Sequence, residues 1–193
     1  HTRGIIQGMD FADISKLLHY DDTYEGTLRA LSWNMRTTGF DLTDLNGEGA
    51  VTLDDLSLLP GSDLQKLLTQ LTEEAKREKD ADLVANFRLA DGIATINRGA
   101  VGGELFAVAA ESGGTIDLQT TDLEMTVVTM LMPKTNRFLR TLPGIDLLTA
   151  FGDDLTRTRI TGPWGSPEIV PIPFLRGTEN TVEWLGNLLS KNV

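Results

Sequence analysis

The chain has 193 residues, of which 40% are hydrophobic and 23% charged, a composition typical of one substantial soluble domain. Its formal net charge of −11 argues against nucleic acid as a partner, because the phosphate backbone would be repelled. It has no cysteine and only two histidines, which excludes disulfides, thiolate nucleophiles and cysteine-based zinc sites. The most apolar stretch, residues 125–132, has the length of a strand and is too short to cross a membrane as a helix.

Two segments near the ends of the chain have the pattern of short amphipathic helices. Over 10–20, Asp10 can cap a helix whose apolar residues, from Phe11 onward, fall on one face. Over 180–191, Asn180 can cap a helix whose apolar residues recur with helical spacing. We therefore expect a helix at each of these places.

A third helix is expected over 62–79. Ser62 and Gln65 have the spacing of a capping box, and leucines recur at i, i+3, i+4 and i+7 from Leu64 to Leu71. The segment continues into the charged stretch EEAKREKD, which we expect to be the solvated end of the same helix.

Most of the remaining chain predicts strands, because polar and apolar residues alternate with a period of two. The strands are expected over about 26–59 and about 82–133, with mixed structure over 134–173. Four segments share a glycine followed by an alternating strand, which is typical of a hairpin meander. These segments are EGTLRA at 25–30, EGAVTL at 48–53, DGIATI at 91–96 and GGTIDL at 113–118.

The stretch DLNGEGAVTLDD at 44–55 has the ligand spacing of a calcium-binding loop of the EF-hand or dockerin type. Its candidate ligands are Asp44, Asn46, Glu48 and Asp55. The flanking sequence does not have the two helices that such a loop needs, and a second copy of the loop is absent. The favoured interpretation is a turn at Gly47 and Gly49 followed by a strand, with calcium binding as the alternative.

Residue patterns for catalysis or cofactor binding are weak. His19 lies in an apolar helical pattern and no G-x-S-x-G sequence accompanies it, so a Ser-His-Asp triad is not expected. Pairs of adjacent aspartates, such as Asp54–Asp55, leave an acid–base pair open, but they fall at expected turns where aspartate serves as a cap. We therefore expect no enzymatic activity, no cofactor and no metal.

Taken in order, the segments from about residue 10 to about 173 resemble the C-terminal region of AsmA-like bacterial envelope proteins (AsmA/TamB type). The first helix is followed by YEGTLRALSWNMRTTG at 24–39 and LNGEGAVTLDDLSLLPGSDLQKLL at 45–68. FRLADGIATINRGAV at 87–101 and ESGGTIDLQTTDLEMTVVTMLMP at 111–133 come next, and TRITGPWGSPEIVPIP at 158–173 closes the match. None of these segments is a catalytic motif.

The resemblance implies a protein on the periplasmic side of the cell envelope, with a role in outer-membrane biogenesis and phospholipid transport between membranes. It also implies a sheet curved into a half-pipe with an apolar inside. The membrane anchor expected of full-length members is not in this sequence, so we expect the chain to be a fragment or a processed form. The expected partners are phospholipid or a membrane, and other envelope proteins or further β-repeats of the same protein.

We therefore expect one α+β domain over 1–193, with a strongly curved, mainly antiparallel sheet (half-pipe or groove-like) and a few amphipathic helices packed on or capping it. The leading hypothesis is an apolar groove that holds acyl chains. The alternatives are an interaction domain that caps a longer β-assembly without binding lipid, and the calcium module. For each single groove residue, the favoured interpretation is an ordinary core in which the 62–79 helix covers that face of the sheet. The candidate groove residues, chosen because 125–132 is apolar on both faces, are Leu123, Met125, Val127, Met130 and Leu131.

Overall fold

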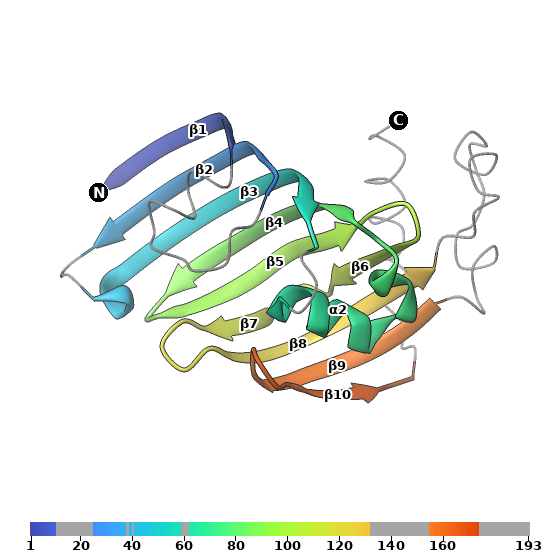
Figure 1. The fold of residues 1–193 in the computed structure, drawn as a ribbon. Helices are drawn as coiled ribbons and strands as arrows, with labels where there is room; N and C mark the ends of the chain where they lie inside the picture. Colours follow the sequence, from blue (N-terminus) through green and yellow to red (C-terminus); the bar gives the residue numbers. More distant parts are fainter. Residues whose placement is uncertain (11–24, 38, 40, 59–61, 132–154, 174–193) are drawn as a thin grey trace, which may run out of the picture.

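The computed structural model describes residues 1–10, 25–37, 39, 41–58, 62–131 and 155–173 (Figure 1). The helix expected over 180–191 and the first part of the mixed region, 134–154, lie outside these residues. The helix expected over 10–20 also lies outside them, apart from Asp10. Within the described ranges, no helix has the length and apolar character needed to cross a membrane.

Ten strands form one sheet in which every pairing is antiparallel. Successive strands are neighbours, except that β6 and β7 share one position between β5 and β8. The predicted antiparallel meander is therefore confirmed. The strands are β1 (Thr2–Asp10), β2 (Thr27–Thr37), β3 (Leu45–Ser57), β4 (Asp80–Ala90), β5 (Ile93–Gly102), β6 (Phe106–Ala110), β7 (Gly114–Asp117), β8 (Asp122–Leu131), β9 (Leu155–Pro163) and β10 (Glu168–Pro171).

Strand β1 was not expected, since the sequence predicted no strand before residue 26. It pairs along its whole length with β2, with Ile6 opposite Leu31 and Asp10 opposite Thr27. Most of its residues are exposed, so the apolar alternation that reveals a half-buried strand is faint here. Pairing with β2 therefore specifies this strand, because the local pattern is too weak to do so.

The helix α2 (Asp63–Leu71) begins where the capping pattern predicted. The hydroxyl of Ser62 accepts a hydrogen bond from the backbone N–H of Gln65 at 3.3 Å. The predicted extent of 62–79 is wrong, because Thr72 is extended (φ −156, ψ 134) and ends the helix. The Thr72 hydroxyl then caps a separate 3-10 turn, η2 (Glu73–Lys76), by accepting from the N–H of Glu74. Sequence periodicity did not reveal this break, since the residues on both sides favour helices.

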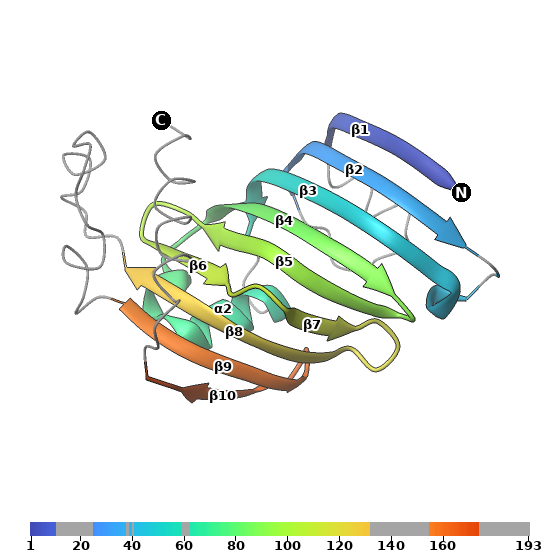
Figure 2. The ribbon, with the colours of Figure 1, turned by 180° about the vertical axis from the view of Figure 1, so that it is seen from behind.

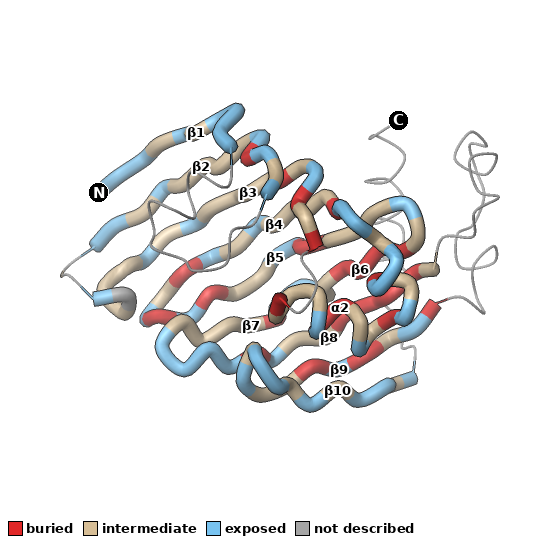
Figure 3. Tube along the Cα trace, viewed as in Figure 1, coloured by how far each residue is buried: buried red, intermediate tan, exposed pale blue. Residues whose placement is uncertain are grey.

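Helix α2 packs on one face of the sheet, which we call the helix face; we call the opposite face the polar face. Leu67 and Leu68 of α2 share a core cluster with Phe106 of β6, Leu123 of β8 and Ile160 of β9. In Figure 1 the helix lies in front of the sheet, and in Figure 2 it lies behind it, so Figure 2 presents the polar face. Burial is concentrated where the helix covers the sheet, whereas β1 and β10 at the two edges are largely exposed (Figure 3).

Three of the four repeated glycines precede or begin a strand, as the pattern predicted: Gly26, Gly92 and Gly114. The expected turn at Gly47 and Gly49 is wrong, because both lie inside β3 and pair with β2 and β4. Neighbouring strands explain these two glycines. A Cβ on Gly49 would lie 2.6 Å from the Phe87 ring, and a Cβ on Gly47 would lie 2.7 Å from the Met35 Cα. Close approach from adjacent strands therefore requires glycine there, with no turn involved.

Candidate functional site

The helix face is apolar across the whole sheet. Residues paired across antiparallel strands lie on the same face, so the register assigns one set of side chains to this face from β1 to β10. Its members include Ile6, Leu31, Trp33, Met35, Val51, Leu53, Leu83, Phe87, Leu89, Ala94, Ile96, Val101, Phe106, Val108, Ile116, Leu123, Met125, Val127, Ile160 and Ile169. No charged residue interrupts these positions, several of which are buried core, so the exposed part of this face is a candidate apolar surface.

One row of this face alternates glycines with large apolar side chains. From β1 to β5 it runs through Gly4, Trp33, Gly49, Phe87 and Ile96, each opposite the next. The Trp33 ring lies over Gly4 and the Phe87 ring over Gly49, where a Cβ would collide with them. The two rings therefore fill the places that side chains on Gly4 and Gly49 would otherwise occupy.

The same row continues over the second half of the sheet. Ile96 lies opposite Gly114, and a Cβ on Gly114 would lie 2.7 Å from the Cβ of Met125. Met125 pairs with Ile160, which in turn pairs with Ile169 at the far edge. The row thus crosses the sheet from edge to edge, perpendicular to the strands.

The two halves of the helix face differ in what covers them. Leu123 and Val127 are only 2% and 3% exposed and lie in the core cluster with α2. Trp33, Met35 and Phe87 are half-buried and belong to neither core cluster formed by the described residues. Leu28 of β2 and Leu53 of β3 are also buried, in a second core cluster against which Leu64 of α2 packs. On β1–β4 the candidate contact for an apolar ligand is therefore the part of the described surface around Trp33, Met35 and Phe87.

The five candidate residues on β8 divide between the two faces. Leu123, Met125, Val127 and Leu131 point to the helix face and take part in or pack against its core cluster. Met130 pairs with Ala107 and Leu155, lies on the polar face, and is 1% exposed. Sequence alternation separated these faces correctly, and at Leu123 and Val127 the structure agrees with the alternative in which the 62–79 segment covers one face as an ordinary core.

The candidate calcium ligands are spread along an extended segment and do not form a loop. Asp44 ends the 3-10 turn η1 (Leu42–Asp44), while Asn46, Glu48 and Asp55 lie within β3. Asp55 sits at a bulge with φ 50, and its N–H donates to Asp82 Oδ1 at 3.1 Å. The described residues contain no group of three or more acidic or histidine side chains arranged to hold a metal ion. The ligand spacing in the sequence therefore does not produce the ligand geometry of an EF-hand.

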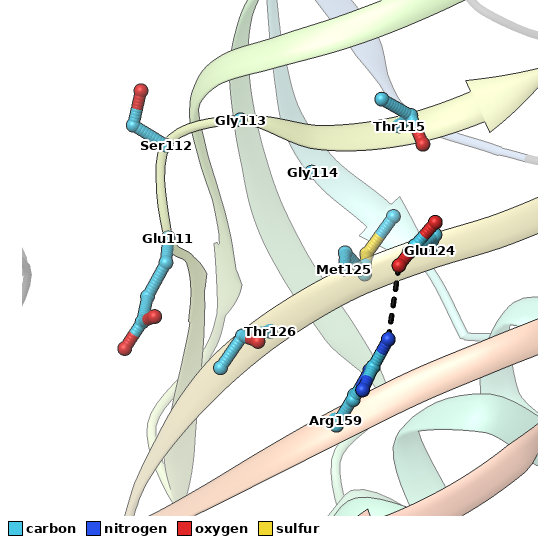
Figure 4. Close-up of a pocket in the computed structure, with 9 residues that line it drawn as sticks. All are labelled: Glu111, Ser112, Gly113, Gly114, Thr115, Glu124, Met125, Thr126 and Arg159. Carbon is cyan, nitrogen blue, oxygen red and sulfur yellow. Dashed lines mark hydrogen bonds and ion pairs between the residues drawn. The ribbon is translucent and has the colours of Figure 1, made fainter. Parts of the chain in front are cut away.

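A polar hollow lies where β6 gives way to β7 (Figure 4). It has a volume of about 310 Å³, and its charged residues are Glu111, Glu124 and Arg159. Arg159 Nη2 contacts Glu124 Oε1 at 2.9 Å, while Glu111 receives two hydrogen bonds of 2.7 Å from Arg157. The hydrogen bonds with Glu111 raise the pKa of Arg157 above its ordinary value. Each of these charges has a partner, so the hollow offers no unpaired acid or base for catalysis.

A second hollow, of about 340 Å³, opens on the polar face over β2–β4. Its polar lining consists of Asn34, Arg36, Asn46, Glu48 and Arg88. Sequence reasoning did not single out these residues, because arginine and asparagine at alternate strand positions are ordinary for a solvated face. Only the strand register brings them together.

Comparison with protein-family models, with curated protein sequences and with solved structures finds no match to this chain. The geometry of the sheet is therefore the evidence for the candidate sites.

Proposed function

We propose that this chain is a non-enzymatic module of the cell envelope, of the AsmA-like kind, whose helix face shields phospholipid acyl chains that move between membranes. The observation that carries the proposal is the apolar row that crosses the sheet from Gly4 to Ile169. An acyl chain is long, flexible and without hydrogen-bonding groups, so a smooth apolar track suits it. The resemblance of the ordered segments to AsmA-like proteins supports the same role.

The proposed contact region differs from the one expected on β8. Acyl chains would lie over the β1–β4 half of the helix face, against Trp33, Met35 and Phe87, because α2 occupies the surface at Leu123 and Val127. Bulges in the β2–β3, β3–β4 and β4–β5 pairings favour a bend of the sheet at this half. The finer proposal is that this bend makes a groove or half-pipe.

Phospholipids with brominated acyl chains test the proposal, since bromine quenches only tryptophans in contact with it. Trp33 fluorescence should be quenched in the wild type, and the contribution should vanish in a Trp33→Phe variant. Phe87→Gln should lose co-purified phospholipid, measured by native mass spectrometry, because it places an amide in the track. Asn86→Gln is the matched control, since Asn86 is the next residue of β4 and points to the polar face. A chain that carries no phospholipid from membranes and shows no quenching would refute the proposal.

The second candidate function is a module that caps a longer β-assembly through an open edge. Strand β1 is nine residues long and lies at one edge of the sheet formed by the described residues, with Ile5 68% and Met9 39% exposed. The other edge, β10, is only four residues long and carries Pro171, with Pro167 and Pro173 beside it. Proline and short length protect an edge against pairing, whereas a long edge with apolar side chains favours it. An added strand, from another envelope protein or a further β-repeat, is therefore expected at β1.

Charge placed on each edge separates the two candidate functions. Ile5→Lys should abolish the addition of a strand at β1. Sedimentation velocity measures this as loss of the complex between the chain and the protein or β-repeat that supplies the strand. Val170→Lys on β10 should leave the same complex intact. Equal effects of the two substitutions would contradict the edge proposal. Retained phospholipid in Ile5→Lys would show that the acyl-chain role does not depend on this edge.

A further inference from the structure

The polar face carries four arginines over β1–β5: Arg3, Arg36, Arg88 and Arg98, which we call the arginine cluster. In the strand register Arg3 lies opposite Asn34, Arg36 opposite Asn46, Arg88 opposite Glu48, and Arg98 opposite Asn86. With neighbouring strands about 4.8 Å apart, the cluster extends for about 20 Å across the sheet.

All four side chains are exposed, and none makes an ion pair or a side-chain hydrogen bond with the part of the chain that the structure describes. Other arginines among the described residues do have partners. Arg29 contacts Asp54 at 2.6 Å, and Arg159 on the same polar face contacts Glu124 at 2.9 Å. A group of unpaired guanidinium groups in a chain with a net charge of −11 is therefore a local exception.

The centre of the cluster is suited to phosphate oxygens. Arg36 and Arg88, with the amides of Asn34 and Asn46, line the hollow of about 340 Å³. Guanidinium groups donate pairs of hydrogen bonds in the geometry that phosphate accepts, and amide N–H groups add further donors. Glu48 is the one carboxylate that lines this hollow.

Exposed apolar side chains lie on the same face beside the arginines. Ile5 on β1 is 68% exposed and pairs with Ser32, and Ile93 on β5 is 42% exposed and pairs with Ala90. Arginines together with exposed isoleucines are typical of a surface that rests among lipid headgroups, where the charges meet phosphates and the apolar groups enter the acyl boundary.

The net negative charge does not prevent such a contact. Charges further away than a Debye length of about 8 Å are largely screened at physiological ionic strength, so the groups at the contact decide the sign of the interaction. Two acids of this face already have partners, since Asp54 binds Arg29 and Asp82 accepts from the N–H of Asp55. Glu48, which lies opposite Arg88, is the acid that opposes the contact.

We propose that the arginine cluster docks the polar face on an anionic phospholipid surface, with headgroup phosphate in the hollow between Arg36 and Arg88. The proposal rests on the envelope function proposed above, which brings the chain to a membrane. It adds a contact with headgroups on one face of the sheet to the acyl-chain contact on the other.

Co-sedimentation with vesicles tests the docking. The wild-type chain should bind an equimolar mixture of phosphatidylglycerol and phosphatidylcholine, and should not bind phosphatidylcholine alone. The double substitution Arg36→Gln with Arg88→Gln should weaken binding about 30-fold, from the energy that each basic residue gains near an anionic surface. Arg159→Gln is the matched control on the same face, and it should change binding little because Glu124 already neutralises that arginine. Glu48→Gln should strengthen binding about fivefold.

Several results would overturn the docking. The docking is refuted if the chain binds vesicles of phosphatidylcholine alone as well as it binds the anionic mixture, or if the double variant binds the anionic vesicles as tightly as the wild type. Weaker vesicle binding by Glu48→Gln also refutes it. Polyglutamate that binds as tightly as the anionic vesicles would assign the cluster to an acidic protein. Displacement of the vesicles by inorganic phosphate at low concentration would assign the hollow to free phosphate and would also overturn it.

Phospholipid that co-purifies with the chain distinguishes the two proposals. A wild type that carries phospholipid but does not bind anionic vesicles overturns the docking and leaves the acyl-chain role standing. A double variant that loses vesicle binding and keeps its phospholipid supports the docking. A wild type that binds anionic vesicles but carries no phospholipid also supports the docking, and it overturns the acyl-chain role alone.

Discussion

The ion pair between Glu111 and Arg157 should couple two strands that are far apart in the sequence. Arg157 Nε and Nη2 donate to the two carboxylate oxygens at 2.7 Å, and Nη1 donates to the Pro173 carbonyl at 3.0 Å. The side chains are only 11% and 21% exposed. Opposite charges about 4 Å apart attract by about 4 kcal/mol at an effective dielectric constant of about 20, and desolvation offsets part of this. We therefore expect a coupling free energy of about 2 kcal/mol.

A double-mutant cycle measures this coupling. Glu111→Gln, Arg157→Gln and the double variant are compared with the wild type by urea unfolding, followed by tryptophan fluorescence. The matched control cycle uses Glu124 and Arg159, whose side chains are 68% and 55% exposed and whose coupling should be below about 0.5 kcal/mol. The control coupling should also disappear in high salt, while the first should persist. Equal coupling in the two cycles would refute the reasoning.

Two further predictions concern the helix and a turn. Leu68→Ala should lower the free energy of unfolding by about 3 kcal/mol, because Leu68 is 1% exposed where α2 packs on the sheet. Gln70→Ala, on the exposed side of α2, should change it little. Urea unfolding measures both variants, and similar losses of stability would contradict the packing of α2. Hydrogen bonds from the N–H groups of Thr120 and Gln119 lower the pKa of Asp117 below its ordinary 3.8. The stability that these bonds contribute is present above the unfolded-state pKa and is lost as pH falls through the lower folded-state pKa. The difference in unfolding free energy between the wild type and Asp117→Ala should therefore shrink in acid. An NMR titration that gives the Asp117 carboxyl group a pKa of 3.8 or above would contradict this.

The sequence predicts the sheet well because alternation is a local signal. In β2 and β4, Leu31, Trp33, Leu83 and Phe87 alternate with polar residues, and all four lie on the helix face. Alternation fails as a predictor where contact with a neighbouring strand determines which residue is present. Gly49 resembles a turn glycine in the sequence, yet it lies in a strand beneath the Phe87 ring.

The candidate site was predicted only in part, for a related reason. The sequence indicated apolar residues on both faces of this segment, and over the described residues 125–131 Met130 does lie on the face opposite the other candidates. The amphipathic pattern of 62–79 allowed a helix over this face, but the position of α2 over Leu123 and Val127 depends on tertiary packing, so the sequence left a covered core and an open groove as alternatives. The arginine cluster is likewise assembled by register, from strands that are up to 95 positions apart in the chain (3 to 98).

The succession of neighbouring strands gives this sheet the energetics of a linear array, in which each strand is stabilised mainly by the strands before and after it. Among the described strands, β1 pairs only with β2, whereas β4 is held between β3 and β5. Local opening therefore needs less free energy at the two edge strands, β1 and β10, than near the centre, so β1 can detach while the remainder stays folded. The open edge is thus also the place where the chain could exchange its own strand for one from a neighbouring molecule without unfolding.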